Sequence, residues 1–150
     1  MGPLTLSVLE KGLTRAAAWR SAGALLPVAI NISPKNLLDE AFPEQVRALL
    51  GKTGVPASGL ELELTENAFM QEPERCLESL ARLHQAGVRL SIDDFGTGYS
   101  SLSYLTRLPV SCLKIELSFI ARMLSEPRER TLVASTIRLA HELGLTVVAE

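Results

Sequence analysis

Short apolar segments alternate with longer segments of helical periodicity, and this alternation restricts the possible folds more than any other feature of the chain. The apolar segments are mostly continuous, which is typical of strands covered on both faces of a parallel sheet. Five such strands are predicted, at Leu26–Ile32, Leu60–Thr65, Val88–Asp93, Cys112–Ile115 and Thr146–Ala149. The pattern therefore indicates an α/β protein built around a parallel sheet.

Helical segments precede and separate these strands. They are predicted at Thr5–Ala22, Pro43–Lys52, Glu74–Gln85, Ser100–Leu105 and Arg128–Leu143. Three of them are followed by Gly23, Gly87 or Gly144, where a helix commonly ends on a left-handed glycine. The order of elements predicts one domain over residues 1–150, either a (β/α)8 barrel with some strands missing or an open doubly wound sheet.

Polar side chains recur at one level of the predicted sheet, near the carboxyl end of each strand. They are Asn31, Glu63, Asp93, Lys114 and Glu150. In a barrel, side chains from several strands converge at this end, whereas an open sheet would spread them along a line. Polar groups beside apolar strands are costly to bury unless they are paired or bind a cation. We therefore expect an incomplete (β/α)8 TIM-type barrel with a site at this end.

The chemistry of these side chains indicates a divalent cation. Carboxylate and amide oxygens suit magnesium or manganese better than zinc or copper. Asp93 and Asp94 are adjacent, and a cation beside them would keep both ionised. The glycines of the following turn allow Asp94 to leave the strand direction and face the same site. Paired cations serve phosphodiester hydrolysis, and Lys114 would add a fixed positive charge near the phosphate or orient the water.

Composition excludes several other classes of protein. The net charge is −2 and the basic residues are scattered, so polymeric nucleic acid is not an expected partner. Cys76 and Cys112 show no metal-ligand or disulfide spacing, which indicates buried free thiols in a reducing cytoplasm. No apolar run approaches the roughly 18 residues of a membrane-spanning helix, so this segment is not expected to contact a membrane.

Several motifs, in order along the chain, resemble those of the EAL family of cyclic-di-GMP phosphodiesterases. The segments are Asn31–Ser33, Glu61–Glu66, Asp93–Leu102, Leu113–Ile115 and Val147–Glu150. The resemblance implies a (β/α)8 barrel that hydrolyses the second messenger cyclic di-GMP to pGpG with Mg²⁺ or Mn²⁺. It also implies a homodimer, and a parent chain that could carry GGDEF or sensory domains and an inner-membrane anchor.

The resemblance assigns roles to particular residues. It implies four metal ligands, namely Asn31, Glu63, Asp93 and Asp94. Lys114 would contact the catalytic water, and Glu150 would help to activate that water as a base. Glu66 would hold the loop Asp94–Ser101, which in the family links the metal site to the dimer interface.

The chain departs from the family pattern in three places. The Glu-Ala-Leu signature, whose Glu is a metal ligand, is expected upstream of the first helix and is not in this sequence. Only about five of the eight strands are identified, and Glu116-Leu117 stands where the family commonly has Asp followed by a polar residue. We therefore expect this chain alone to be inactive, although the parent domain is expected to be an enzyme.

Other interpretations remain open at this stage. The domain could bind cyclic di-GMP or mediate dimerisation without catalysis, or it could be an unrelated metal-dependent barrel enzyme acting on another phosphate ester. Taken singly, Glu63 could be an outward strand residue, Asn31 a turn cap, Lys114 an edge charge and Glu66 an acid at a helix start. Glu61 is expected on the surface.

Overall fold

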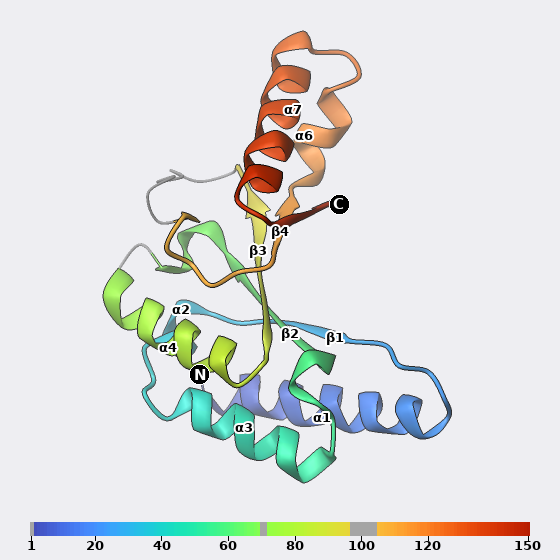
Figure 1. Cartoon of the computed structure of the whole chain (residues 1–150), viewed down its shortest axis with the longest axis vertical. Coiled ribbons are helices and arrows are strands. Elements are labelled where there is room, and N and C mark those ends of the chain that lie inside the picture. Colours follow the sequence, from blue (N-terminus) through green and yellow to red (C-terminus); the bar gives the residue numbers. More distant parts are fainter. Residues whose placement is uncertain (1, 70–71, 97–104) are drawn as a thin grey trace.

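Five parallel strands form one sheet whose spatial order follows the sequence (Figure 1). The computed structural model describes residues 2–69, 72–96 and 105–150. The strands are β1 (Val28–Asn31), β2 (Leu60–Thr65), β3 (Arg89–Phe95), β4 (Cys112–Ile115) and β5 (Thr146–Ala149). A doubly wound sheet would reverse direction at a switch point, and this order has none, so that alternative is wrong. Consecutive parallel strands are the arrangement of a (β/α)8 barrel, here as an open five-stranded section.

Helices connect the strands. They are α1 (Gly2–Ser21), α2 (Pro34–Leu37), α3 (Phe42–Thr53), α4 (Pro73–Gln85), α6 (Leu117–Arg122) and α7 (Pro127–Glu142), with short 3₁₀ turns η1 (Ala57–Gly59) and η2 (Glu66–Phe69). Four of the five predicted helices are confirmed. The fifth, predicted at Ser100–Leu105, lies almost entirely outside the described residues. None of these helices is long and apolar enough to cross a membrane, as far as the chain is described.

The predicted strands match the observed ones closely, with two differences. Strands β2, β4 and β5 have the predicted bounds. Strand β1 begins only at Val28, because Leu26 is exposed and Pro27 has no amide hydrogen to donate to a ladder. Strand β3 continues to Phe95 because pairing with β4 resumes there after a register shift.

The two faces of the sheet have opposite character because side chains alternate along each strand. Toward the helices lie buried apolar side chains from neighbouring strands: Ile30, Leu60, Leu62, Leu64, Leu90, Ile92, Leu113 and Ile115. Helix α1 packs on β1, α4 on β3 and α7 on β5. The other face is polar and carries Asn31, Glu63, Asp93 and Lys114. The strands are therefore apolar on one face only, which differs from the expectation of two covered faces.

Helix α1 approaches β1 most closely at a glycine. A Cβ atom on Gly12 would lie 3.0 Å from Ile30 Cδ1 and 3.3 Å from Val28 Cγ1. At Gly51 of α3, by contrast, a Cβ atom would meet no heavy atom within 4 Å. Substitutions at Gly12 and Gly51 therefore test two effects separately, close packing at Gly12 and helix propensity at Gly51.

We expect Gly12→Leu to destabilise the fold by about 1–3 kcal/mol, because the added side chain overpacks the α1–β1 contact. Gly51→Ala is the matched control, and it should stabilise the fold by roughly 0.5–1 kcal/mol through helix propensity. Urea denaturation followed by circular dichroism measures both changes. Equal stability of Gly12→Leu and the unaltered chain would contradict the packing described at this contact.

Candidate functional site

Three carboxylates from three strand ends surround the ammonium group of Lys114 on the polar face. Its Nζ lies 3.0 Å from Glu63 Oε1 and 3.7 Å from Asp93 Oδ1, and it also pairs with Glu150 Oε1. Glu63 belongs to β2, Asp93 to β3 and Lys114 to β4, and Glu150 directly follows β5. Four residues that the sequence places at separate strand ends are thus brought into contact, as predicted for a common site.

The register of the sheet explains this convergence. Lys114 lies opposite Val148 in β5, and Glu150 is two residues further on, so it returns to the same face. On the other side, Glu63 and Asp93 alternate with apolar residues that face the helices. The carboxyl ends of parallel strands lie at the same edge of the sheet, so the side chains at these ends lie close together.

The ammonium group of Lys114 is held in its charged form. Burial alone would lower its pKa, because the side chain is only 13% exposed. Hydrogen bonds to Glu150 and Glu63 and the charges of Glu63 and Asp93 outweigh that effect, so the pKa lies above its ordinary value. Lys114 is therefore a fixed positive charge and not a proton donor at neutral pH.

Asp94 leaves the strand direction, as the following glycine suggested. Its φ is 53°, a left-handed value that is rare for a residue other than glycine, and its N–H donates to Asp93 Oδ1 at 3.0 Å. Desolvation and the negative charges of Asp93, Glu116 and Glu150 raise the pKa of the Asp94 carboxyl, against the opposing charge of Lys114. The second acid of the pair thus lies within electrostatic reach of the Lys114 cluster, on an exposed turn.

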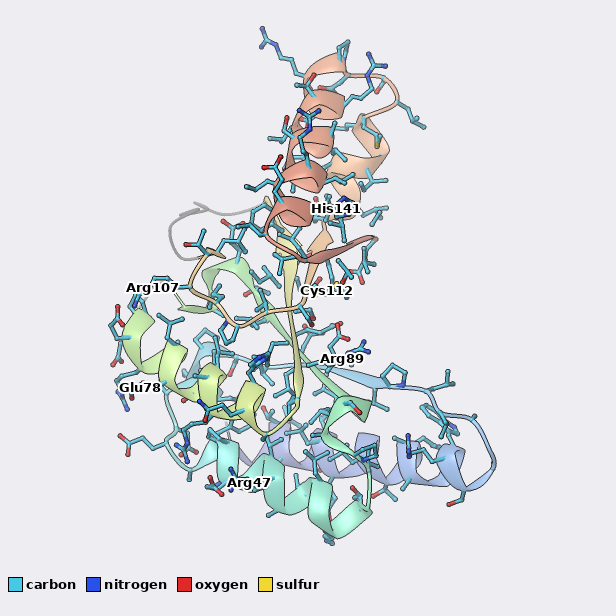
Figure 2. The ribbon with its side chains drawn as sticks, viewed as in Figure 1. Arg47, Glu78, Arg89, Arg107, Cys112 and His141 are labelled. Carbon is cyan, nitrogen blue, oxygen red and sulfur yellow. The ribbon has the colours of Figure 1, made fainter. Side chains whose placement is uncertain are left out.

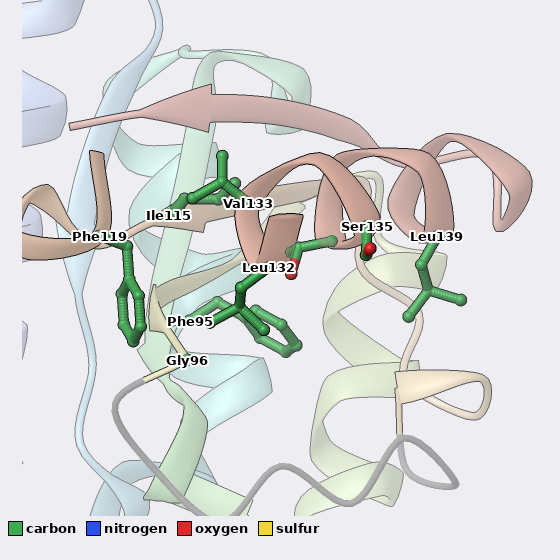
Figure 3. A pocket seen from close by; sticks show the side chains of 9 residues that line it. Phe95, Gly96, Ile115, Phe119, Leu132, Val133, Ser135 and Leu139 are labelled. Atoms are coloured by element: carbon green, nitrogen blue, oxygen red, sulfur yellow. The ribbon is translucent and has the colours of Figure 1, made fainter. Parts of the chain in front are cut away.

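Glu66 lies beside this turn and not in the cluster itself. It is only 3% exposed, and its Oε2 accepts a hydrogen bond from Gly96 N at 3.0 Å. Gly96 has a φ of 103°, and a Cβ atom there would lie 3.1 Å from the Phe119 ring of α6. Figure 3 shows Phe119 and Phe95 near Gly96 on the helix side of the sheet. A buried carboxylate and an aromatic ring therefore fix the backbone two residues after Asp94.

Asn31 ends β1 at the edge of the site. It is paired in register with Glu63 and is exposed. The chain turns sharply after it because Asn36 Oδ1 accepts hydrogen bonds from Ser33 N at 3.0 Å and Ser33 Oγ at 2.8 Å. Asn36 is 3% exposed, and Pro34 then begins α2. Asn36 was not predicted from the sequence, although Ser33-Pro34 is a turn signal.

Glu116 follows β4 at the start of α6, where its carboxylate accepts a hydrogen bond from the Ser118 hydroxyl. Its charge also contributes to the raised pKa of Asp94. The Glu in place of the family's usual Asp is thus still close to the acidic turn.

Two further residues of the polar face were misjudged or missed. Glu61 was expected on the surface, but its side chain is only 12% exposed and pairs with Arg89 at 2.5 Å, because the two lie opposite each other in register. Figure 2 shows Arg89 with Cys112 near the middle of the molecule. Ser91 of β3 is fully buried, and its hydroxyl has no hydrogen-bond partner within the described chain. Burial of this kind depends on strand register, which the sequence alone does not provide.

The oxygen donors suit a hard divalent cation, but they are arranged around an ammonium group. Within residues 2–69, 72–96 and 105–150, no group of three or more His, Cys, Asp or Glu side chains is placed to hold a metal ion. Lys114 Nζ lies 3.0 Å from Glu63 Oε1 and 3.7 Å from Asp93 Oδ1, so a metal ion held by both oxygens at roughly 2.0–2.6 Å would meet the ammonium group. The donor chemistry of Glu63 and Asp93 fits magnesium or manganese.

An apolar cavity of about 360 Å³ lies on the opposite side of the sheet (Figure 3). It is lined by Phe95, Gly96, Ile115, Phe119, Leu132, Val133, Ser135, Thr136 and Leu139. It contains none of the charged residues of the cluster, so it is not where metal or phosphate chemistry would take place.

Comparison with known proteins identifies the family. The sequence profile of the EAL domain matches residues 1–150. The chain belongs to the EAL domain family. It is 45% identical over 125 residues to the cyclic di-GMP phosphodiesterase NbdA of Pseudomonas aeruginosa, a match that covers 83% of this chain and 16% of NbdA.

Solved EAL structures resemble the fold closely. The EAL domain of Mycobacterium smegmatis DcpA matches with a TM-score of 0.91 and 39% identity, over 99% of this chain and 67% of that one. The PaMucR phosphodiesterase in complex with c-di-GMP also has a TM-score of 0.91, with 34% identity over 98% of this chain and 60% of that one. The incomplete TIM-type barrel is therefore confirmed as the fold class. The chain spans 20% or less of the curated relatives from Azorhizobium caulinodans, Caulobacter vibrioides and Pseudomonas aeruginosa that it matches.

We expect Gly96→Ala to destabilise the EAL fold by about 1–3 kcal/mol, because alanine is strained at this φ and its Cβ would press on the Phe119 ring. Gly23→Ala is the matched control, since Gly23 has a φ of 88° with no heavy atom within 4 Å of the added Cβ. It should cost only the conformational strain, about 1 kcal/mol. Denaturation midpoints measure both, and an equal loss at the two positions would mean that the Phe119 contact adds nothing.

Proposed function

We propose that the EAL domain containing these residues hydrolyses cyclic di-GMP to linear pGpG with Mg²⁺ or Mn²⁺. The observation that carries this proposal is the convergence of Glu63, Asp93, Lys114 and Glu150 on one face at the carboxyl ends of four strands. Carboxylates beside a fixed ammonium can bind cations, orient water and steady a phosphate. The family membership narrows the phosphate ester to a cyclic dinucleotide.

The names and bound ligands of three relatives support this substrate. NbdA is named a cyclic di-GMP phosphodiesterase, and the PaMucR structure is a complex with c-di-GMP. A structure of Klebsiella pneumoniae BlrP1, 28% identical over 97% of this chain and 36% of that one with a TM-score of 0.86, is a complex with calcium and cy-diGMP. A divalent cation and the dinucleotide therefore occur together in one related protein.

In this proposal the metal ligands are Asn31, Glu63, Asp93 and Asp94. Two cations held there would activate a water molecule and offset the charge that develops on the phosphate. Asn31 and Glu63 lie side by side in register, and Asp94 lies within electrostatic reach of Asp93 and Glu150. Glu66 contributes indirectly, because its bond to Gly96 limits where Asp94 can lie.

Lys114 and Glu150 would act on the attacking water. Glu150 Oε1, which pairs with Lys114 Nζ, can accept a proton from a water bound beside it. Lys114 remains protonated, so it donates hydrogen bonds and positions both that water and the Glu150 carboxylate. In this proposal Glu150 accepts the proton of the water, and Lys114 orients the water and the Glu150 carboxylate.

A second candidate function is cyclic di-GMP binding without hydrolysis. It is favoured by the ammonium-centred arrangement of the acids in the described part of the chain and by Glu116 in place of the usual Asp. Incubation with cyclic di-GMP and Mn²⁺ followed by chromatography of the nucleotides distinguishes the two functions. Appearance of pGpG supports the enzyme, and saturable binding with intact cyclic di-GMP supports the receptor.

We expect Asp93→Asn to abolish hydrolysis by a protein that contains the whole domain and to weaken Mn²⁺ binding by roughly tenfold or more, because the amide cannot replace the lost negative charge. Asp39→Asn is the control, since Asp39 is exposed and far along the chain from the cluster. Calorimetry with Mn²⁺ and a pGpG assay give the two readouts. Unchanged affinity and turnover in Asp93→Asn would remove Asp93 from the ligand set.

We also expect a polypeptide of only these 150 residues to show little or no turnover and to self-associate. Among the described residues, β1 pairs only with β2 and β5 only with β4, so each outer strand has an unpaired edge. The resemblance also places a further ligand Glu upstream of α1. An assay beside a protein extended at both ends, with light scattering for size, tests this. Equal turnover by the shorter polypeptide, or a strictly monomeric state, would contradict it.

A further inference from the structure

We propose that Lys114 has a second role as the resident counter-cation of the acidic cluster, which an incoming divalent cation must displace. This inference rests on the proposed function, because it takes Glu63 and Asp93 as metal ligands. It goes beyond that function by assigning Lys114 an opposing effect on metal affinity. The same residue would stabilise the metal-free site and compete with the metal.

The geometry places the ammonium group where the acids converge. Lys114 Nζ contacts oxygens of Glu63, Asp93 and Glu150 at the same time, from β2, β3 and the end of β5. The side chains of Glu63 and Asp93 are only 9% and 14% exposed, so solvent screens their charges weakly. The oxygens of Glu63 and Asp93 are also among those that would coordinate a cation in the proposed mechanism.

The acidic side chains near Lys114 carry more negative charge than its single ammonium group offsets. Lys114 contacts Glu63 from β2, Asp93 from β3 and Glu150 after β5. Asp94 lies within electrostatic reach of Lys114, and Glu116 after β4 lies within electrostatic reach of Asp94. Another basic group on the polar face, Arg89, is paired with Glu61. One ammonium group therefore offsets only part of the negative charge, and a divalent cation would offset more of it.

The ammonium group and the cation cannot occupy the cluster together. A cation about 2.0–2.6 Å from oxygens of Glu63 and Asp93 would overlap or strongly repel an ammonium group that contacts the same oxygens. The flexible stem of Lys114 allows it to swing away. Its bond to Glu150, which lies furthest into solvent of the three acids, gives it a position beside the water that the proposed mechanism requires.

Displacement lowers the observed metal affinity, because part of the binding free energy is used to break the contacts of Lys114 with Glu63 and Asp93. Removal of the ammonium group should therefore strengthen metal binding while weakening the metal-free fold. A residue that only orients the catalytic water would not affect metal affinity in this direction.

The test compares Lys114→Met and Lys114→Gln with the unaltered sequence, each in a protein that contains the whole domain. Both variants keep much of the side-chain length and lose the charge, while Lys114→Arg keeps the charge. Lys52→Met is the control for loss of a lysine–glutamate pair, since Lys52 contacts Glu10 at 2.6 Å on the surface with its side chain 68% exposed. Mn²⁺ affinity is measured by calorimetry, and melting temperature is measured in EDTA and in Mn²⁺.

We expect Lys114→Met and Lys114→Gln to bind Mn²⁺ roughly tenfold or more tightly than the unaltered chain, because a unit charge about 4 Å from the cation is removed. Their melting temperatures should fall in EDTA and rise by a larger increment with Mn²⁺. Lys114→Arg and Lys52→Met should not bind Mn²⁺ more tightly. If Lys114→Met is unfolded in EDTA, folding on addition of Mn²⁺ supports the proposal in the same way.

Folded Lys114 variants that bind Mn²⁺ no more tightly than the unaltered chain would overturn this inference and leave the proposed function standing. Variants that remain unfolded at millimolar Mn²⁺ would also overturn it, since the metal would then fail to replace Lys114. Absence of Mn²⁺ binding by the unaltered chain and by every variant would instead refute the metal site of the proposed function.

Discussion

The contact of one ammonium group with carboxylates from three other strand ends depends on a single constraint, the parallel order of the strands. Because β2, β3, β4 and β5 run in the same direction, their carboxyl ends meet at one edge of the sheet. The helices cover only the opposite face, where the buried leucines and isoleucines lie. The polar face can therefore collect acids without disturbing the core, and Lys114 offsets part of their repulsion.

The acidic turn is connected to the helical layer through a glycine. Gly96 is hydrogen-bonded to Glu66, and a Cβ atom added to it would lie 3.1 Å from the Phe119 ring. The guanidinium group of Arg122 lies 5.4 Å from the centre of that ring, and Arg122 also pairs with Glu129 of α7 at 3.6 Å. A continuous set of contacts thus links the backbone two residues after Asp94 to α6 and α7.

The sequence predicted the sheet well because the signals for parallel strands are local. Continuous or alternating apolar runs located β2, β4 and β5 to the residue, and the placement of Glu63, Asp93 and Lys114 near strand ends followed from those bounds. Pairing between side chains could not be predicted in this way. The Glu61–Arg89 pair and the burial of Ser91 depend on strand register, and α2 and α6 are too short to show a helical period.

The arrangement around Lys114 also explains how a site rich in acids can form before a cation arrives. Metal sites whose ligands repel one another often fold only when the metal binds. Here the ammonium group contacts Glu63, Asp93 and Glu150 within the folded sheet, so the carboxylates are brought together by a charge that the chain itself supplies. As a consequence, the ammonium group lies where a metal ion held by Glu63 and Asp93 would bind. Movement of one flexible side chain, with the strands held in place, is then enough to convert one arrangement into the other.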